Sequence, residues 1–273
     1  MSSHASEVQR GERYQFGKNW QRFLEVLDDT RIAEAERSLS EMLGVTTLAG
    51  KRFLDAGSGS GIMSLAARRL GARVHSFDFD PQSVACTEEL RRRYFIDDPS
   101  WTIEEASVLD TEYIASLGES DVVYSWGVLP HTGHMWDALA NITKPVAANG
   151  TLFIAIYNDQ GTKSALWKRV KQIYCSGPVG RGAVSEVFVP AFAIEGLAVD
   201  IKHRTNPLER YVSSKRPRGM SVVRDWFDWL GGYPFEVARP EEIFAFYRER
   251  GYTLEKMTTG GAGCNQFVFA RRS

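Results

Sequence analysis

Short apolar segments alternate with amphipathic segments through the first 158 residues of the chain. The apolar segments predict strands, and the segments between several of them have the three-to-four-residue apolar spacing of helices. Such an alternation is typical of a parallel sheet with helices on both faces, and it predicts an α/β fold. Strands are expected at residues 51–56, 73–78, 101–106, 121–126 and 150–157, and helices at 61–70, 81–95 and 133–147.

The two ends of the chain and its middle depart from this alternation. Apolar residues from Ile32 to Leu43 recur at helical spacing, and Gly44 follows them as a stop signal. The alternation breaks after Asn158 and returns with a predicted helix at 240–251, after which two closing strands are expected at 252–259 and 264–271. We therefore expect an N-terminal helical segment at residues 1–48, a core formed by residues 49–158 and 239–273, and an insertion at residues 159–238.

The composition fits a globular protein and disfavours several classes of function. The chain has 273 residues, 43% of them hydrophobic, which is enough for a sizeable core. Its net charge of −1 provides no positive field for a nucleic acid. The three cysteines lack any CxxC spacing, so no disulfide framework and no metal site are predicted. No signal peptide is evident and no apolar stretch approaches the ~20 residues of a membrane span, so a cytoplasmic location is expected.

The segment FLDAGSGSG, residues 53–61, carries the strongest signal for a ligand. A strand that ends in glycines and continues into a helix brings backbone N–H groups and the positive end of the helix up to a ligand, usually a nucleotide. Gly57, Gly59 and Gly61 would form this loop. Asp78, which ends the second predicted strand, is placed to accept hydrogen bonds from both hydroxyls of a ribose.

Two details favour S-adenosylmethionine over NAD as this ligand. The spacing is G-x-G-x-G, and Ile62 stands where the dinucleotide fingerprint requires a small residue. Asp55 lies directly before the loop, where a carboxylate would repel a pyrophosphate but attract an ammonium group, directly or through water. S-adenosylmethionine has an ammonium group, a ribose and an adenine, and it has no phosphate. NAD remains the alternative ligand.

With these residues the sequence resembles the class I S-adenosylmethionine-dependent methyltransferases over most of its length. The resemblance rests on FLDAGSGSG, VHSFDFDP, ASVLD and the stretch from DVVYSWG to AIYN. The His-containing segment after the fourth strand is similar to that of small-molecule methyltransferases related to the ubiquinone-biosynthesis O-methyltransferases. The resemblance implies a Rossmann-like sheet of seven strands, mostly parallel with an antiparallel last strand. It also implies S-adenosylmethionine as methyl donor and S-adenosylhomocysteine as product.

The resemblance further implies which residues hold the cofactor. The loop after the third strand often supplies an acid to the adenine amino group, but this chain has Ser107 there. We expect backbone groups at Ser107 and Val108 to serve instead, with Val108 packing on the adenine. Asp80 is expected to cap the following helix rather than to touch the ligand. The residues expected at the cofactor are Asp55, Gly57, Ser58, Gly59, Gly61, Asp78, Phe79, Ser107, Val108, Leu109, Trp126, Tyr14 and Phe16.

His131 is the candidate catalytic base. It follows the fourth predicted strand, where ligands bind in open α/β sheets, and an imidazole there could take a proton from a hydroxyl as it attacks the methyl group. A role in orienting the loop is its alternative. Because amines and carboxylates need no base, N- and carboxyl-methylation stay open beside methylation of a hydroxyl. A protein that binds S-adenosylmethionine or NAD without catalysis also stays open.

The N-terminal aromatic residues and the insertion are candidates for the acceptor site. Tyr14 and Phe16 could fold over the ligand as part of a lid. The basic and aromatic residues of the insertion favour a cap over an aromatic or acidic small molecule, and its alternative role is an interface in a homo-oligomer. A DNA methyltransferase is disfavoured because WGVLPH stands where the amino-group enzymes carry D/N/S-P-P-Y/F. The residues expected at the acceptor are Trp20, His134, Tyr157, Arg210 and Trp226.

Overall fold

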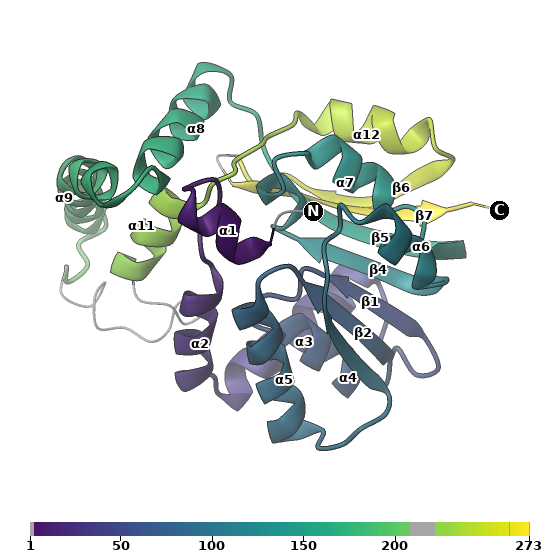
Figure 1. Ribbon diagram of the computed structural model, residues 1–273. Coiled ribbons are helices and arrows are strands. Elements are labelled where there is room, and N and C mark those ends of the chain that lie inside the picture. The colour runs from purple at the N-terminus through teal and green to yellow at the C-terminus, as the bar shows by residue number, and fades with distance from the viewer. Residues whose placement is uncertain (1–2, 208–221, 262, 273) are drawn as a thin grey trace. The chain divides into compact units, whose positions relative to one another are not determined.

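The chain divides into two compact units in the computed structural model, which describes residues 3–207, 222–261 and 263–272 (Figure 1). The first, here called the sheet unit, comprises Gly17–Gly161 and Glu236–Ser273. The second, here called the helical unit, comprises Met1–Phe16 and Thr162–Phe235. Arg210, which the sequence suggested at the acceptor, lies outside the described residues, as do Lys215 and Arg218, two further basic residues of the insertion.

The sheet unit is built on a seven-stranded sheet of order β3-β2-β1-β4-β5-β7-β6. The first five strands pair in parallel, and β7 runs antiparallel to both β5 and β6. This arrangement confirms the predicted α/β fold and its antiparallel last strand. The strands are β1 (Arg52–Ala56), β2 (Arg73–Asp78), β3 (Trp101–Glu105), β4 (Ser120–Trp126), β5 (Val146–Tyr157), β6 (Tyr252–Thr258) and β7 (Cys264–Arg271).

Helices cover both faces of this sheet (Figure 1). One face buries strand residues such as Leu54 and Ile154 against Leu139 of α7 and Ile243 of α12. The other face is covered by α3, α4 and α5. The helices of the sheet unit are α2 (Gly17–Glu25), α3 (Asp29–Leu43), α4 (Ile62–Arg69), α5 (Pro81–Tyr94), α6 (Thr111–Ser116), η1 (Leu129–His131), α7 (Met135–Asn141) and α12 (Pro240–Arg248).

One helix and two boundaries differ from the sequence expectation. The α6 helix was not predicted, because its six residues are too few for a helical period. Asp110 begins this helix by accepting hydrogen bonds from the N–H groups of Glu112 and Tyr113. The expected helix at 133–147 ends at Asn141, and β5 begins at Val146 rather than at residue 150. A register shift between Ser120 and Val122 lets the strand begin early.

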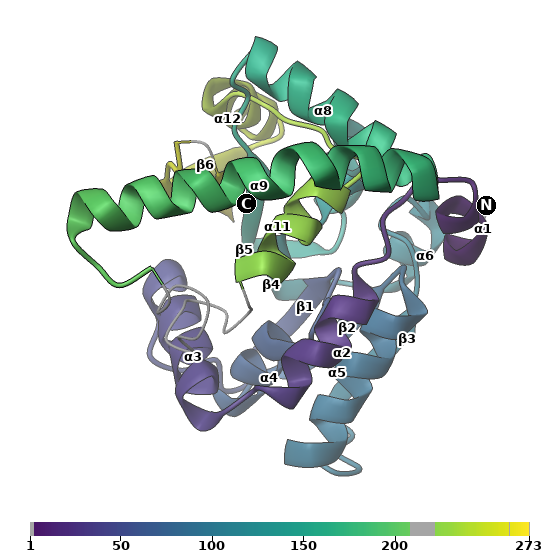
Figure 2. The same cartoon turned by 90° about the vertical axis from the view of Figure 1, so that its left-hand side faces the viewer.

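Within the described residues, the helical unit contains four helices, of which α8, α9 and α11 pack on one another. The four are α1 (His4–Gln9), α8 (Thr162–Cys175), α9 (Pro178–His203) and α11 (Val222–Gly231), and Figure 2 shows α9 running beside α8 and α11. The N-terminal segment joins this unit because the Tyr14 N–H donates to the Tyr233 carbonyl at 2.8 Å. Tyr14 Oη also donates to Asp228 at 3.2 Å. Val170, Tyr174, Cys175, Val184 and Leu230 form the buried centre.

The α9 helix is apolar on most of its circumference. It is 26 residues long, and among the described residues it is the one helix whose length and composition would suit a membrane span, with a mean hydropathy of 1.5. The expectation that no apolar stretch approaches the length of a membrane span is therefore wrong for α9. Glu186 and Glu195 lie within its sequence, but the helix as a whole is long and apolar enough. Val179, Val187, Ile194 and Ile201 lie on its exposed side.

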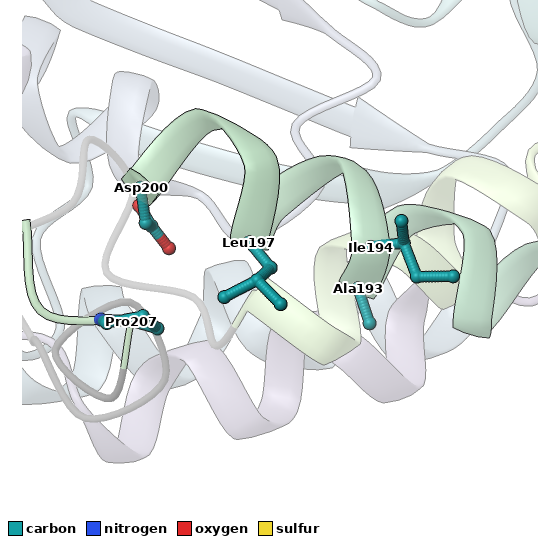
Figure 3. Close-up of a pocket in the computed structure, with 5 residues that line it drawn as sticks. All are labelled: Ala193, Ile194, Leu197, Asp200 and Pro207. Atoms are coloured by element: carbon teal, nitrogen blue, oxygen red, sulfur yellow. The ribbon is translucent and has the colours of Figure 1, made fainter. Parts of the chain in front are cut away.

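A hollow of about 300 Å³ lies at the C-terminal end of α9 (Figure 3). It is lined by Ala193, Ile194, Leu197, Asp200 and Pro207. The Asp200 carboxylate accepts a hydrogen bond from Thr205 Oγ1 at 3.2 Å, so this acid closes the end of its own helix. We assign no ligand to the hollow.

A lysine lies inside the core of the helical unit. Lys171 of α8 is 1% exposed, and its Nζ donates to the Trp229 carbonyl. The ammonium also lies over the Trp229 ring, 3.9 Å from its centroid, and 4.9 Å from the centroid of Phe235. Burial lowers the pKa of Lys171 to about 7. The ring contacts and the carbonyl offset part of the desolvation cost of the charged form.

Lys171→Met should stabilise the protein most strongly at low pH. Because the folded-state pKa lies below the ordinary value of 10.5, the unfolded chain holds the proton more tightly. The cost of Lys171 is therefore full below about pH 7 and fades as the pH rises toward the unfolded value. Denaturant unfolding should show a gain of about 2 kcal/mol near pH 6 that shrinks near pH 9.5. Lys168→Met, at an exposed position of the same helix, is the control. An equal gain in unfolding free energy at both pH values for Lys171→Met would contradict this account.

Candidate functional site

The carboxyl ends of the parallel strands of the sheet unit lie at one edge of the sheet. In the strand register, Asp55 near the end of β1 stands opposite Ser76 of β2 on one side and Tyr124 of β4 on the other. The chain leaves β1 toward β2 and β3, and it later returns to β4 on the opposite side of β1. In open α/β sheets, ligands bind at such a reversal of strand order.

The glycine loop follows β1 at this edge and is held by β2. The N–H groups of Gly57 and Ser58 donate to the Phe77 carbonyl at 2.8 and 3.1 Å, and the Gly59 N–H donates to Asp78 Oδ2 at 2.9 Å. Gly61, with φ of +80°, begins α4. The loop therefore leads directly into a helix N-terminus at the edge where a ligand is expected.

Each glycine of the loop faces a different neighbour. A Cβ on Gly57 would lie 2.4 Å from the Val128 methyl groups, and one on Gly61 would lie 2.8 Å from the Thr87 Cα. These two contacts explain glycine at 57 and 61 by packing inside the sheet unit alone. A Cβ on Gly59 would lie 3.2 Å from Nε1 of Trp20, a residue of α2. Sequence reasoning did not identify Val128 and Thr87, because they lie far from the loop along the chain and carry no local signal.

Asp78 is held firmly at the end of β2. Its Oδ2 accepts the Gly59 N–H, and its Oδ1 accepts the Asp80 N–H at 2.9 Å. These contacts orient the carboxylate beside the glycine loop. Its contact with the hydroxyls of a ribose stays a prediction.

Asp55 lies beneath the loop in a chain of buried hydroxyls. Its Oδ2 accepts a hydrogen bond of 2.5 Å from Ser64 Oγ, and Ser64 is bonded in turn to Ser76 Oγ at 2.7 Å. Trp101 Nε1 donates to Ser76 Oγ at 2.9 Å, so the donors point toward the carboxylate. Desolvation raises the pKa of Asp55 to about 7, although the Ser64 hydrogen bond opposes the shift. Part of the carboxyl population therefore carries its charge at neutral pH.

The loop after β3 presents Ser107 and Leu109 as partly exposed residues. Val108 is 5% exposed and packs into the core, and its carbonyl accepts from Asn141 Nδ2 at 3.1 Å. Ser107 Oγ accepts the Leu109 N–H at 3.2 Å. Contacts of these residues with an adenine stay a prediction.

His131 ends the short helix η1 that follows β4. It is 8% exposed, and its ring meets Tyr157 edge-on with the centroids 5.5 Å apart. Tyr157 is the last residue of β5, so the structure brings together one residue predicted for catalysis and one predicted for the acceptor. His131 lies after the carboxyl end of β4 and Tyr157 at the carboxyl end of β5, at the same edge of the sheet as the glycine loop.

A family model described as a methyltransferase domain matches residues 54–152, which include the glycine loop, Asp78 and His131. The ubiquinone biosynthesis O-methyltransferase of Pasteurella multocida is 32% identical over 116 residues, which are 41% of this chain and 48% of that protein. The ribosomal protein L11 methyltransferase of Alteromonas mediterranea is 50% identical over 52 residues, 19% of this chain and 18% of that protein. The chain thus spans less than half the length of these two relatives.

Solved structures agree on the fold. The magnesium protoporphyrin IX methyltransferase of Synechocystis, solved with S-adenosylhomocysteine, has a TM-score of 0.53 at 13% identity and covers 89% of this chain and 83% of that one. The N-methyltransferase of Bradyrhizobium japonicum, also in complex with S-adenosylhomocysteine, has a TM-score of 0.51 at 13% identity and covers 95% of this chain and all of that one. The chain carries a class I S-adenosylmethionine-dependent methyltransferase domain. The sheet unit contains the matched segment of this domain.

The remaining predicted residues fall into separate places. Trp20 lies at the glycine loop of the methyltransferase domain, and its contact with an acceptor stays a prediction. His134 precedes α7 without capping it, and its exposed ring lies 3.7 Å from Asp137. Tyr14 and Trp226 belong to the helical unit, where Trp226 packs on Phe192 with centroids 5.8 Å apart.

Two other expected cofactor residues lie at the carboxyl ends of strands, and a third belongs to the helical unit. Phe79 follows β2, and Trp126 ends β4; both are partly exposed. Phe16 belongs to the helical unit and packs edge-on against Tyr14, with centroids 5.0 Å apart. Within the described residues, no group of three His, Cys, Asp or Glu side chains could hold a metal ion.

Proposed function

We propose that the protein transfers a methyl group from S-adenosylmethionine to a small molecule, at a hydroxyl oxygen. The observation that carries this proposal is the junction of the glycine loop and Asp78, joined by the hydrogen bond from the Gly59 N–H. The junction lies at the reversal of strand order, where the loop leads into the N-terminus of α4 beside a fixed carboxylate.

The residues at this edge fit the cofactor group by group. Asp78, which accepts the Gly59 N–H, would accept the ribose hydroxyls. Asp55 would provide negative charge on the ammonium side, in the fraction of molecules where it is ionised. The loop at Ser107 and Leu109 would flank the adenine. When bound, the cofactor supplies an electrophilic methyl on a cationic sulfur.

His131 would act on the acceptor. Methyl transfer is an in-line displacement, so the protein mainly has to align the acceptor oxygen and exclude water. A buried imidazole at the end of β4 could remove the hydroxyl proton as the oxygen attacks, and the edge contact with Tyr157 would hold the ring in place. An amine or carboxylate acceptor would not need this step, which is why the role of His131 separates O-methylation from the alternatives.

A small-molecule acceptor is favoured over a protein by the extent of the similarities. Those to ubiquinone biosynthesis O-methyltransferases extend over as much as 50% of this chain, while those to ribosomal protein L11 methyltransferases extend over 19% to 30% of it. A short match centred on a shared cofactor motif carries little information about the acceptor. The low charge of the chain also favours a small molecule over a nucleic acid.

Asp78→Ala should weaken binding of S-adenosylhomocysteine by about 2 kcal/mol, because it removes a charge-assisted contact to the ribose hydroxyls. Isothermal titration calorimetry of the wild type should show binding of S-adenosylhomocysteine and none of NAD. Asp137→Ala, at an exposed position of α7, is the matched control and should bind like the wild type. Unchanged affinity in a folded Asp78→Ala protein would refute the assignment of Asp78.

A further inference from the structure

Helix α2 is tied to α5 at both of its ends. At its start, the Gly17 N–H donates to Asp80 Oδ2 at 2.8 Å. At its end, Arg93 Nη1 of α5 donates to the Leu24 carbonyl at 3.0 Å. Gly17, Phe23 and Leu24 are buried in the sheet unit. The helix is therefore a fixed part of this unit, although it precedes the sheet in sequence and forms none of its crossovers.

The fixed position of α2 places Trp20 against the glycine loop. The indole Nε1 lies 3.2 Å, and Cε2 3.3 Å, from the point where a Cβ on Gly59 would stand. Among the three loop glycines, only Gly59 meets a side chain from this N-terminal helix within the described residues. Gly59 also donates its N–H to Asp78, so the indole and the group proposed to bind the ribose both lie at this glycine.

Asp80 connects the two features. Its Oδ1 accepts the Gln82 N–H at 2.9 Å and so caps α5, while its Oδ2 accepts the Gly17 N–H. Its own N–H donates to Asp78 Oδ1. The helix cap expected from the sequence is thus confirmed, but the same carboxylate has a second partner 63 residues away. Two consecutive hydrogen bonds link the proposed ribose carboxylate to the start of α2.

We propose that Asp80 is a positioning residue of the cofactor site, which holds α2 so that the Trp20 indole forms one wall of the pocket at Gly59. The proposal rests on the proposed function, since it names S-adenosylmethionine as the occupant. Asp80 acts through Trp20 and touches no reacting atom. The wall adds affinity because it shields the cofactor from water at the point where the glycine loop leaves it open.

Asp80→Asn tests the link with a minimal change. The Gln82 N–H and the Gly17 N–H face different oxygens of Asp80, and an asparagine replaces one of these oxygens with an NH2 donor, so it cannot both cap α5 and bind the Gly17 N–H in this arrangement. Hydrogen exchange of the protein without cofactor should become faster over residues 17–25. Asp110→Asn is the matched control, because one oxygen of Asp110 accepts both of its N–H partners and an asparagine can do the same. Unchanged exchange over residues 17–25 in Asp80→Asn would overturn the link.

Gly17→Ala tests the same link by sterics. A Cβ at Gly17 would lie 2.5 Å from Gln82 Cβ and 2.7 Å from Asp80 Oδ2, so α2 would have to move away. Alanine would otherwise favour the helix, so faster exchange of α2 would point to the lost contact and not to a weaker helix. Gly182→Ala, in α9 with no atom within 4 Å of the added Cβ, is the control.

Calorimetry with S-adenosylhomocysteine separates a positioning role from general destabilisation. Trp20→Ala and Asp80→Asn should each raise the dissociation constant about fivefold to tenfold. If Asp80 acts through Trp20, the double variant should bind no more weakly than Trp20→Ala alone. The proposal would be overturned if the dissociation constant of the double variant rose by the product of the two single effects. It would also be overturned if Trp20→Ala bound S-adenosylhomocysteine with unchanged or higher affinity. Wild-type protein that fails to bind S-adenosylhomocysteine would instead refute the proposed function, and the exchange experiments would still report on the link.

Discussion

His131→Ala is expected to lower the turnover number by about 10² to 10⁴, the range that a positioned general base contributes. The affinity for S-adenosylhomocysteine should change little, because the imidazole serves the acceptor and not the cofactor. The acid limb of the pH–rate profile of the wild type should disappear in the variant. Steady-state kinetics over a pH series, with calorimetry of cofactor binding, measure both quantities.

His203→Ala provides the control for this experiment. His203 is an exposed residue of α9 in the helical unit, so its removal should leave turnover and pH profile as in the wild type. Near-normal turnover of His131→Ala would show that the histidine supports the loop through its contact with Tyr157. Methylation of an amine or a carboxylate would then fit better than methylation of a hydroxyl.

Excision of Thr162–Phe235 is expected to abolish methylation of the native acceptor and to leave binding of S-adenosylhomocysteine largely intact. The insertion begins after β5, at the edge of the sheet where the methyl group is expected, and it is much longer than a crossover requires. In the sheet unit, the residues on either side of the excised segment are hydrogen-bonded to each other. Ala238 N donates to the Tyr157 carbonyl at 3.1 Å, and Asp159 N donates to the Ala238 carbonyl at 3.2 Å.

A short polar linker from Gly161 to Glu236 should therefore suit the excised protein. Circular dichroism and calorimetry would establish that the sheet unit folds and binds cofactor, and activity on the acceptor would then be compared with the full chain. Unchanged activity and specificity would contradict a cap role. The insertion would in that case be better explained as an interface between copies of the chain.

Local sequence patterns predicted the strands because each one is an apolar run bounded by turn or helix signals. The parallel strands β1, β4 and β5 are buried along most of their length, which makes the runs nearly continuous. Asp78 and the glycine loop were recognisable because both follow directly from a strand end. The short α6 and the early start of β5 were missed, since six residues show no period and a register shift leaves no apolar signature.

Contacts between residues distant in sequence were beyond such patterns. The N–H of Gly17 bonds to Asp80, and Tyr14 bonds to Tyr233, but neither pair is marked by spacing or composition. The sequence therefore indicated the helix cap at Asp80 and not its second partner. Nor does any spacing in the sequence indicate that Trp20 lies at Gly59.

Isotope transfer tests the central proposal most directly. The full-length protein would be incubated with S-adenosylmethionine that carries a deuterated methyl group and with a cell extract, which is then separated by size and analysed by mass spectrometry. We predict that deuterated methyl groups enter a compound of the small-molecule fraction with the wild type, and that this labelling is lost with Asp78→Ala. Label found only in the protein or nucleic acid fraction, or no transfer by a protein that binds the cofactor, would contradict methylation of a small molecule.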